Sequence, residues 1–131
     1  MFVYVKKIKV MSKSKKTVVI GASSNPSRYA YVATNRLKQA GHEVVPVGLR
    51  TGMIGDVEIH KDFPEIEDVD TVTLYVGPKN QDYWKDYIYS LNPKRVIFNP
   101  GTESEFQNEL EARGIEATEA CTLVLLSIDE Y

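Results

Sequence analysis

Apolar positions along the chain follow two different spacings. Short apolar runs rich in β-branched residues alternate with longer segments in which apolar residues recur every three or four positions. The predicted strands are 17–20, 43–48, 57–59, 70–76, 95–98 and 115–117. The strands at 57–59 and 115–117 are expected to be short. The predicted helices are 25–40, 80–91 and 103–113. This alternation is typical of βαβ units, so we predict an α/β fold of the three-layer, Rossmann-like, doubly wound kind, with a mostly parallel sheet of about five strands.

Turn-forming residues mark where these elements begin and end. Asn25-Pro26 is expected to start the first helix as its N-cap and first helical residue, and Gly41 to end it. Thr102 and Glu105 fit a capping box at the start of the third helix. Residues 49–62 are expected to be irregular apart from the short strand, and the apolar segment 121–128 is expected to be either helical or extended.

The first fifteen residues form an N-terminal extension or an edge strand, whereas residues 16–131 are expected to form a single domain. Met1 to Val10 alternates apolar and basic positions. Either Met11 is the true start and the preceding residues are an upstream extension, or the segment is an extra edge strand whose lysines discourage aggregation.

Composition describes an ordinary globular protein. Of the 131 residues, 43% are hydrophobic and 26% charged, with a net charge of −2, so a nucleic acid partner is not expected. A single cysteine, Cys121, and two histidines, His42 and His60, provide neither a disulfide framework nor a spaced metal-ligand set. No apolar run approaches the roughly 20 residues that span a bilayer, and no signal peptide is recognisable. The expected location is the cytoplasm, away from membranes.

The turn after the first predicted strand carries the strongest functional signal. Val19-Ile20 is followed directly by Gly21-Ala22-Ser23-Ser24-Asn25-Pro26 and then by helical spacing. A strand that turns through glycine into a helix start presents unpaired N–H groups and the positive end of the helix dipole, which together can bind a phosphate. The alternative is a tight strand-to-helix connection with no ligand.

The turn does not match the dinucleotide-binding fingerprint G-x-G-x-x-G. Only Gly21 matches, because Ser23 and Pro26 stand at the second and third glycine positions. The second strand is followed by Gly48-Leu49-Arg50, and no carboxylate occurs before Asp56 to bind an NAD ribose. A guanidinium at Arg50 suits a phosphorylated ribose, as in coenzyme A (CoA) or NADP, although an exposed loop arginine can also be merely solvated.

Two stretches carry a resemblance to a known family. Val19 to Arg28 and Gly41 to Val47 resemble the single-domain CoA-binding family, which is similar to the N-terminal CoA-binding domain of the succinyl-CoA synthetase α subunit. The resemblance covers about Lys16 to Leu126, and residues 99–102 and 119–122 agree with one branch of the family. The chain departs from the family at Gly48-Leu49, where Asn-Pro is common.

The resemblance implies that CoA lies across the carboxyl ends of the strands. The Gly21–Asn25 turn would donate to the phosphates with Arg28 as a nearby cation, and Arg50 would approach the ribose phosphate. Residues 76–78 would pack against the adenine or the pantetheine, and residues 99–101 would close the far side. The implied cofactor-binding residues are Gly21, Ala22, Ser23, Ser24, Asn25, Arg28, Arg50, Val76, Gly77, Pro78, Asn99, Pro100 and Gly101.

No catalytic set emerges from the sequence. His42 is expected to be structural at a helix end, His60 lies in the irregular segment, and Cys121 is either a small buried hydrophobe or a reactive thiol. We therefore expect a non-catalytic module that binds CoA or an acyl-CoA. The alternatives are a small NADP-type oxidoreductase and an acyl-CoA enzyme that needs a partner subunit. Besides the small-molecule ligand, a protein partner or a homo-oligomer remains open.

Overall fold

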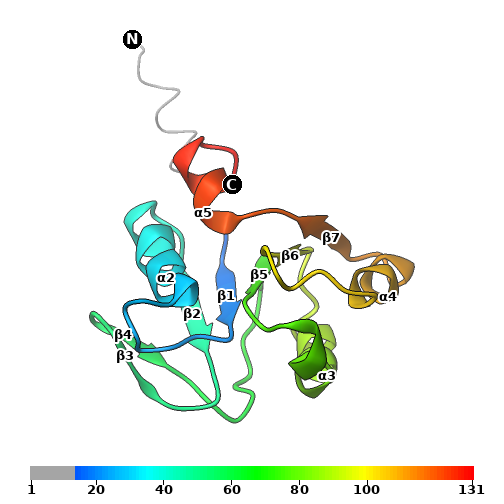
Figure 1. Ribbon diagram of the computed structural model, residues 1–131, viewed down its shortest axis with the longest axis horizontal. Helices are drawn as coiled ribbons and strands as arrows, with labels where there is room; N and C mark the ends of the chain where they lie inside the picture. Colours follow the sequence, from blue (N-terminus) through cyan, green and yellow to red (C-terminus); the bar gives the residue numbers. More distant parts are fainter. Residues whose placement is uncertain (1–13) are drawn as a thin grey trace.

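The computed structural model describes residues 14–131. The predicted N-terminal extension or edge strand lies outside the described residues except for its last two positions. Five parallel strands form the main sheet, in the order β2-β1-β5-β6-β7 (Figure 1). Their bounds are β1 (Thr17–Ile20), β2 (Val44–Val47), β5 (Thr71–Leu74), β6 (Arg95–Phe98) and β7 (Glu116–Glu119). The predicted α/β fold with a five-stranded parallel sheet is confirmed.

The strand order reverses direction once, between β1 and β5. From β1 the chain moves outward to β2 at the edge and then returns to β5 on the other side of β1. In register, Ile20 pairs with both Val47 and Leu74, so the carboxyl ends of these three strands lie level. In open α/β sheets such a reversal creates a crevice outside the carboxyl ends of the strands, where ligands bind.

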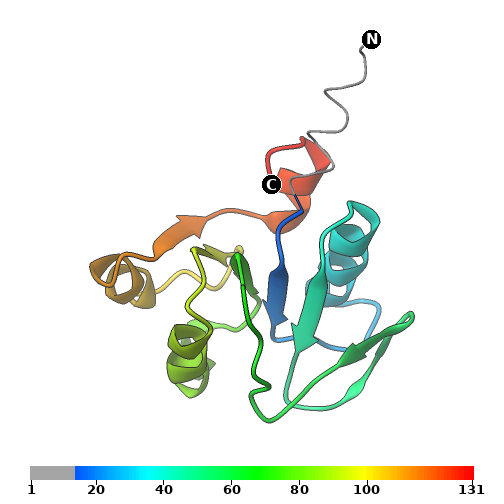
Figure 2. The ribbon, with the colours of Figure 1, turned by 180° about the vertical axis from the view of Figure 1, so that it is seen from behind.

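Helices cover both faces of the sheet (Figures 1 and 2). On one face α2 (Tyr29–Gln39) packs against α5 (Thr122–Ser127), and on the other lie α3 (Asp82–Leu91) and α4 (Phe106–Ala112). In β1 the side chains alternate, Val18 packing into the core beneath α3 and α4 and Val19 into the core beneath α2. A strand buried on both faces reads as a continuous apolar run, which is why β1 is recognisable in the sequence.

The segment expected to be irregular contains a β-hairpin. β3 (Gly52–Ile54) pairs antiparallel with β4 (Val57–Ile59), so the strand predicted at 57–59 is present and its partner was missed. Ile54 and Ile59 are both buried. The hairpin is attached to β2, because the His60 amide donates to the Pro46 carbonyl at 3.0 Å and the Gly48 amide donates to the His60 carbonyl at 2.9 Å.

Two predicted helix starts are wrong. The first helix begins at Tyr29, because Asn25 does not cap it: the Asn25 Oδ1 accepts hydrogen bonds from the Ser27 amide at 3.0 Å and the Ser27 hydroxyl at 2.8 Å. Residues 21–28 are therefore a longer loop than expected.

The third predicted helix begins later than expected, because α4 starts at Phe106 and not at residue 103. Its reciprocal cap is formed by Ser104 and Gln107: the Phe106 amide donates to the Ser104 Oγ at 3.2 Å, and the Ser104 amide donates to the Gln107 Oε1 at 3.0 Å. The Thr102 hydroxyl instead donates to the Asn99 carbonyl.

Of the two alternatives for residues 121–128, the helix is correct, as α5. Within residues 14–131 no helix has both the length and the apolarity needed to cross a membrane.

Candidate functional site

The loop between β1 and α2 is fixed by two glycines that allow close backbone approach. Gly21 has φ +93°, and a β-carbon there would lie 2.6 Å from the Tyr75 carbonyl oxygen at the end of β5. A β-carbon at Gly48, just after β2, would lie 2.5 Å from the Ala22 carbonyl oxygen. Distances this short leave no room for a side chain, so the backbone just after β2 and just after β5 contacts the loop backbone directly.

Only some of the loop amides can serve a ligand. The amides of Gly21 and Ala22 both donate to the Val47 carbonyl, at 3.0 and 3.1 Å. These two amides were expected to donate to a phosphate, but in the structure they are already engaged within the protein. The Asn25 amide donates to the Ser23 Oγ at 3.0 Å. In the part of the chain that the structure describes, the loop and helix-start amides without an acceptor are those of Ser23, Ser24, Tyr29 and Ala30.

These amides border a cavity of about 1400 Å³ at the reversal of strand order. Its walls are the loop and the start of α2, the segment after β2, the segment after β5 and the start of α3. Of the implied binding residues, the structure brings together Gly21, Ala22, Ser23, Ser24, Asn25, Arg28, Arg50, Val76 and Gly77 in this lining. Pro78 begins the short helix η1 (Pro78–Asn80), is exposed and lies beside the lining rather than in it.

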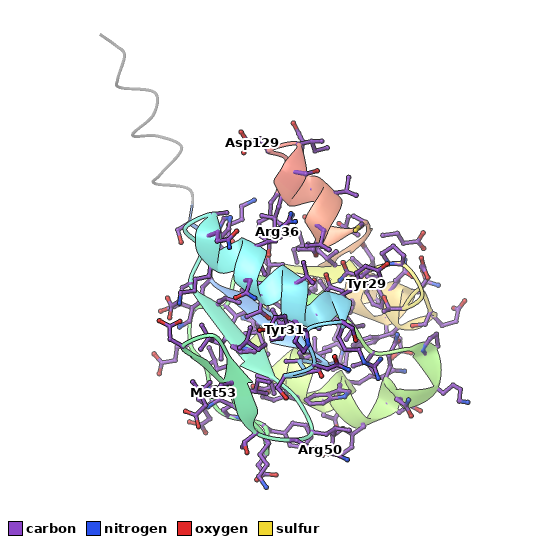
Figure 3. All side chains as sticks on the ribbon, turned by 60° about the vertical axis from the view of Figure 1, so that its left-hand side comes forward. Tyr29, Tyr31, Arg36, Arg50, Met53 and Asp129 are labelled. Carbon is purple, nitrogen blue, oxygen red and sulfur yellow. The ribbon has the colours of Figure 1, made fainter. Side chains whose placement is uncertain are left out.

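The cavity is positively charged although the chain has a net charge of −2. Arg28, Arg50 and Lys79 line it, and within residues 14–131 no aspartate or glutamate does. Arg50 lies in the segment that connects β2 to β3, and Figure 3 shows it below Tyr29, the first residue of α2. Lys79 was not identified from the sequence. Its position five residues after Leu74, the last residue of β5, is the signal that could have found it, because carboxyl ends of parallel strands share one edge.

Aromatic side chains complete the lining. Tyr29 is 74% exposed and Tyr83 58% exposed, whereas Trp84 is buried. Tyr83 and Trp84 meet edge to face with ring centroids 5.2 Å apart. Tyr75 lies at the end of β5, where burial raises the pKa of its hydroxyl to about 12, so this group stays protonated at neutral pH. Exposed aromatic faces beside cations suit a ligand that has a flat ring as well as phosphates.

Asn99, Pro100 and Gly101 do not line the cavity. The buried Asn99 amide donates to the Thr73 hydroxyl at 2.7 Å and the Leu74 carbonyl at 2.9 Å. Its Oδ1 accepts from the Thr122 amide at 2.9 Å, which caps α5. Pro100 and Gly101 are exposed. The structure thus places Asn99 where it joins β6, β5 and α5.

Gln81, another buried polar residue, supports the cavity from behind. Its Nε2 donates to the carbonyls of Val76 at 2.9 Å and Thr102 at 2.6 Å, and its Oε1 accepts from the Ser104 hydroxyl at 2.5 Å. Every polar atom of this side chain is therefore engaged with the two loops after β5 and β6. The bonds hold Val76 in place at the cavity wall, and sequence patterning did not single this residue out.

The residues considered for catalysis lie elsewhere. His42 sits at the amino end of the sheet, where its Nδ1 accepts from the Lys15 amide at 2.9 Å. Burial, together with the charges of Lys15 and Arg95, lowers the pKa of His42. Cys121, half-buried, precedes α5, and His60 uses its backbone to attach the hairpin. Residues 14–131 contain no group of three or more side chains that could hold a metal ion.

Comparison with solved structures agrees with this architecture. A structure described as that of an uncharacterized protein is 50% identical, covers 90% of this chain and 98% of its own, and has a TM-score of 0.87. A conserved hypothetical protein from Pyrococcus furiosus is 29% identical over 84% of this chain and 97% of its own, with a TM-score of 0.73. A Thermus thermophilus protein is 22% identical, covers 96% of this chain and 97% of its own, and has a TM-score of 0.74; at this identity the likeness shows the fold alone. No curated protein matches the chain.

The fold and the position of the cavity define a Rossmann-like α/β protein with a crevice at its strand-order reversal. A family model described as "CoA binding domain" matches residues 15–127. The chain belongs to this CoA-binding domain family, as its resemblance in sequence predicts, and membership supports CoA binding in general.

Proposed function

We propose that the protein binds CoA or an acyl-CoA through the Gly21–Arg28 loop and acts as a binding module without catalytic activity of its own. The observation that carries the proposal is the coincidence of unengaged amides with three cations and no carboxylate among the described residues of one cavity. CoA has a diphosphate and a ribose phosphate, so this combination suits it, whereas a carboxylate-lined cavity would repel it.

The individual contacts follow from what the loop leaves free. The amides of Ser23, Ser24, Tyr29 and Ala30 would donate to the diphosphate, with Arg28 close by. Arg50 would meet the ribose phosphate, and Lys79 would add a third cation from the opposite wall. Val76 and Gly77 would contact the adenine or the pantetheine. This set replaces the amides of Gly21 and Ala22 as donors and retains both residues as the floor of the site.

The cavity lining has hydroxyl groups but lacks the usual groups that activate them, which supports a binding role. Among the described residues, the lining contains serines, a threonine, tyrosines and Lys79, but no cysteine, and no histidine, aspartate or glutamate that could activate a serine. A binding module could act as a carrier, a sensor or a regulator of a partner. The acyl group remains unspecified.

Isothermal titration of the full chain with CoA, acetyl-CoA, NAD and NADP tests the proposal. We expect saturable heat with CoA and acetyl-CoA and none with NAD or NADP. Saturable binding of NADP together with no response to CoA would overturn it and would favour a small oxidoreductase. Incubation of acetyl-CoA with the protein, followed by chromatography, should return the thioester unchanged; its consumption would overturn the non-catalytic part.

A further inference from the structure

A second groove runs along the other side of α3. It has a volume of about 760 Å³ and lies between α3 and the chain that leads from β4 to β5, whose path beside α3 is visible in Figure 2. We call it the α3 groove. Its lining residues are Phe63, Pro64, Glu65, Ile66, Glu67, Tyr83, Asp86, Tyr87, Ser90 and Leu91.

The charge of the α3 groove is opposite to that of the loop cavity. Glu65, Glu67 and Asp86 line it, and within residues 14–131 no lysine or arginine does. None of the three carboxylates forms an ion pair with a described residue. Lys16 reaches Glu67 only at its backbone carbonyl, at 2.6 Å. The two cavities share one lining residue, Tyr83.

The segment that carries Phe63 into the groove has an unusual backbone. Asp62, Phe63 and Asp68 have φ of 62°, 55° and 58°, and they are three of the five non-glycine residues with positive φ in the described chain. Aspartate adopts this left-handed conformation fairly often, whereas a bulky residue such as Phe63 does so only under strain. Strain of this kind persists where the surrounding contacts impose it and is frequent at functional sites.

The strained backbone holds the Phe63 ring in place. Its centroid lies 5.2, 5.5 and 5.1 Å from those of Tyr83, Trp84 and Tyr87. The Tyr87 hydroxyl donates to the Pro64 carbonyl at 2.6 Å, which ties the segment to α3. Phe63 nevertheless remains 39% exposed. A large ring that is strained into position and still open to solvent gives a preformed aromatic surface beside the three carboxylates of the groove.

Aromatic faces next to carboxylates recognise ammonium and guanidinium groups, through cation–π attraction and charge-assisted hydrogen bonds. The groove is elongated: its α3 wall runs from Tyr83 to Leu91, about 12 Å at 1.5 Å per residue. That length accommodates three to four residues of an extended chain, at roughly 3.3 Å each, rather than a single small amine. We propose that the α3 groove is a docking site for a lysine- or arginine-rich segment of a partner protein.

This site does not depend on CoA binding, so its test is made without CoA. Fluorescence anisotropy with a labelled octa-arginine peptide is measured on the full chain, at low and at physiological ionic strength. We compare the wild type with the Glu65→Gln/Asp86→Asn variant, with Phe63→Leu, and with the control variant Glu58→Gln/Glu130→Gln, whose exposed carboxylates lie outside the groove. The control pair matches the charge change of the first pair.

We expect the peptide dissociation constant to rise about tenfold in the Glu65/Asp86 variant and about fivefold in Phe63→Leu, and to stay unchanged in the control. If the peptide affinity falls equally in both charge variants, the binding depends on net charge alone. If the affinity is unchanged in Phe63→Leu, the aromatic ring does not contribute to it. Either result overturns the proposal. Should Phe63→Leu fail to fold, Tyr83→Leu tests the same wall, since Tyr83 is 58% exposed. Sedimentation that shows a wild-type dimer lost in the Glu65/Asp86 variant would overturn it too, because a second copy would then fill the groove.

Discussion

The α-carbon of Gly48 approaches the Ala22 carbonyl so closely that a β-carbon would lie 2.5 Å from the oxygen. The backbone of the residue after β2 is therefore in direct contact with the loop that is proposed to bind phosphate. This contact gives a physical reason for glycine at position 48: the chain passes the loop with no side chain between them.

Substitution of Gly48 by alanine should displace the loop. Overpacking that forces a backbone shift costs about 1–3 kcal/mol, so we expect the CoA dissociation constant to rise about tenfold and the melting temperature to fall. Titration calorimetry and thermal denaturation measure the two effects. Gly77→Ala is the control for stability, because Gly77 has φ −65° and a β-carbon added there would meet nothing within 4 Å. A Gly48→Ala protein with wild-type affinity would contradict the expectation.

Arg50 should distinguish CoA from dephospho-CoA. If its guanidinium meets the ribose phosphate, Arg50→Ala should weaken CoA about threefold to tenfold, as for an exposed ion pair, and leave dephospho-CoA almost unchanged. The matched control is Arg36→Ala, since Arg36 is an exposed arginine of α2 outside the cavity lining. Equal weakening of both ligands would place Arg50 away from this phosphate.

Asn99 should matter for stability. In Asn99→Leu the Leu74 carbonyl and the Thr122 amide would lose their buried partner, which should lower the free energy of unfolding by about 2–4 kcal/mol. Asn80→Leu, at an exposed position, should change it by less than about 0.5 kcal/mol. Urea denaturation of both variants gives the comparison. An Asn99→Leu protein as stable as wild type, with weakened CoA binding, would instead assign Asn99 to the ligand.

The sheet was predictable from the sequence because its strands are buried on both faces. Runs such as Thr17–Ile20 are buried at every position, so apolar and β-branched pattern alone locates them. β3 was missed because Gly52 and the exposed Met53 hide a strand in which only Ile54 is buried. The start of α2 was misplaced since Asn-Pro is a generic helix start, whereas here the Asn25 side chain closes a turn onto Ser27.

The site was predictable where it is marked by local sequence pattern. The Gly21–Asn25 turn was identified from a strand that runs through glycine into a helix, and Arg50 from its position after the second strand, and they do line one cavity. Lys79, Tyr29 and Tyr83 belong to the same cavity only because the strand order places β1, β2 and β5 side by side. Tyr83 in particular follows the helical spacing of a core residue, yet it is 58% exposed. Such neighbours depend on three-dimensional placement, which local pattern does not encode.

His42 should make stability depend on pH. Its pKa is lowered from 6.5 in the folded protein, chiefly by burial, so the folded state binds fewer protons than the unfolded state and the free energy of unfolding rises with pH in this range. The contribution is complete above about pH 6.5 and is lost as the pH falls through the lowered folded-state pKa. Protonation at Nδ1 would also remove the acceptor for the Lys15 amide. Asparagine keeps an acceptor without this titration, so urea midpoints measured from pH 7.5 downward should fall less in His42→Asn than in wild type. His60→Asn is the matched control and should follow the wild-type curve; if His42→Asn follows it as well, the His42 environment does not control this pH dependence.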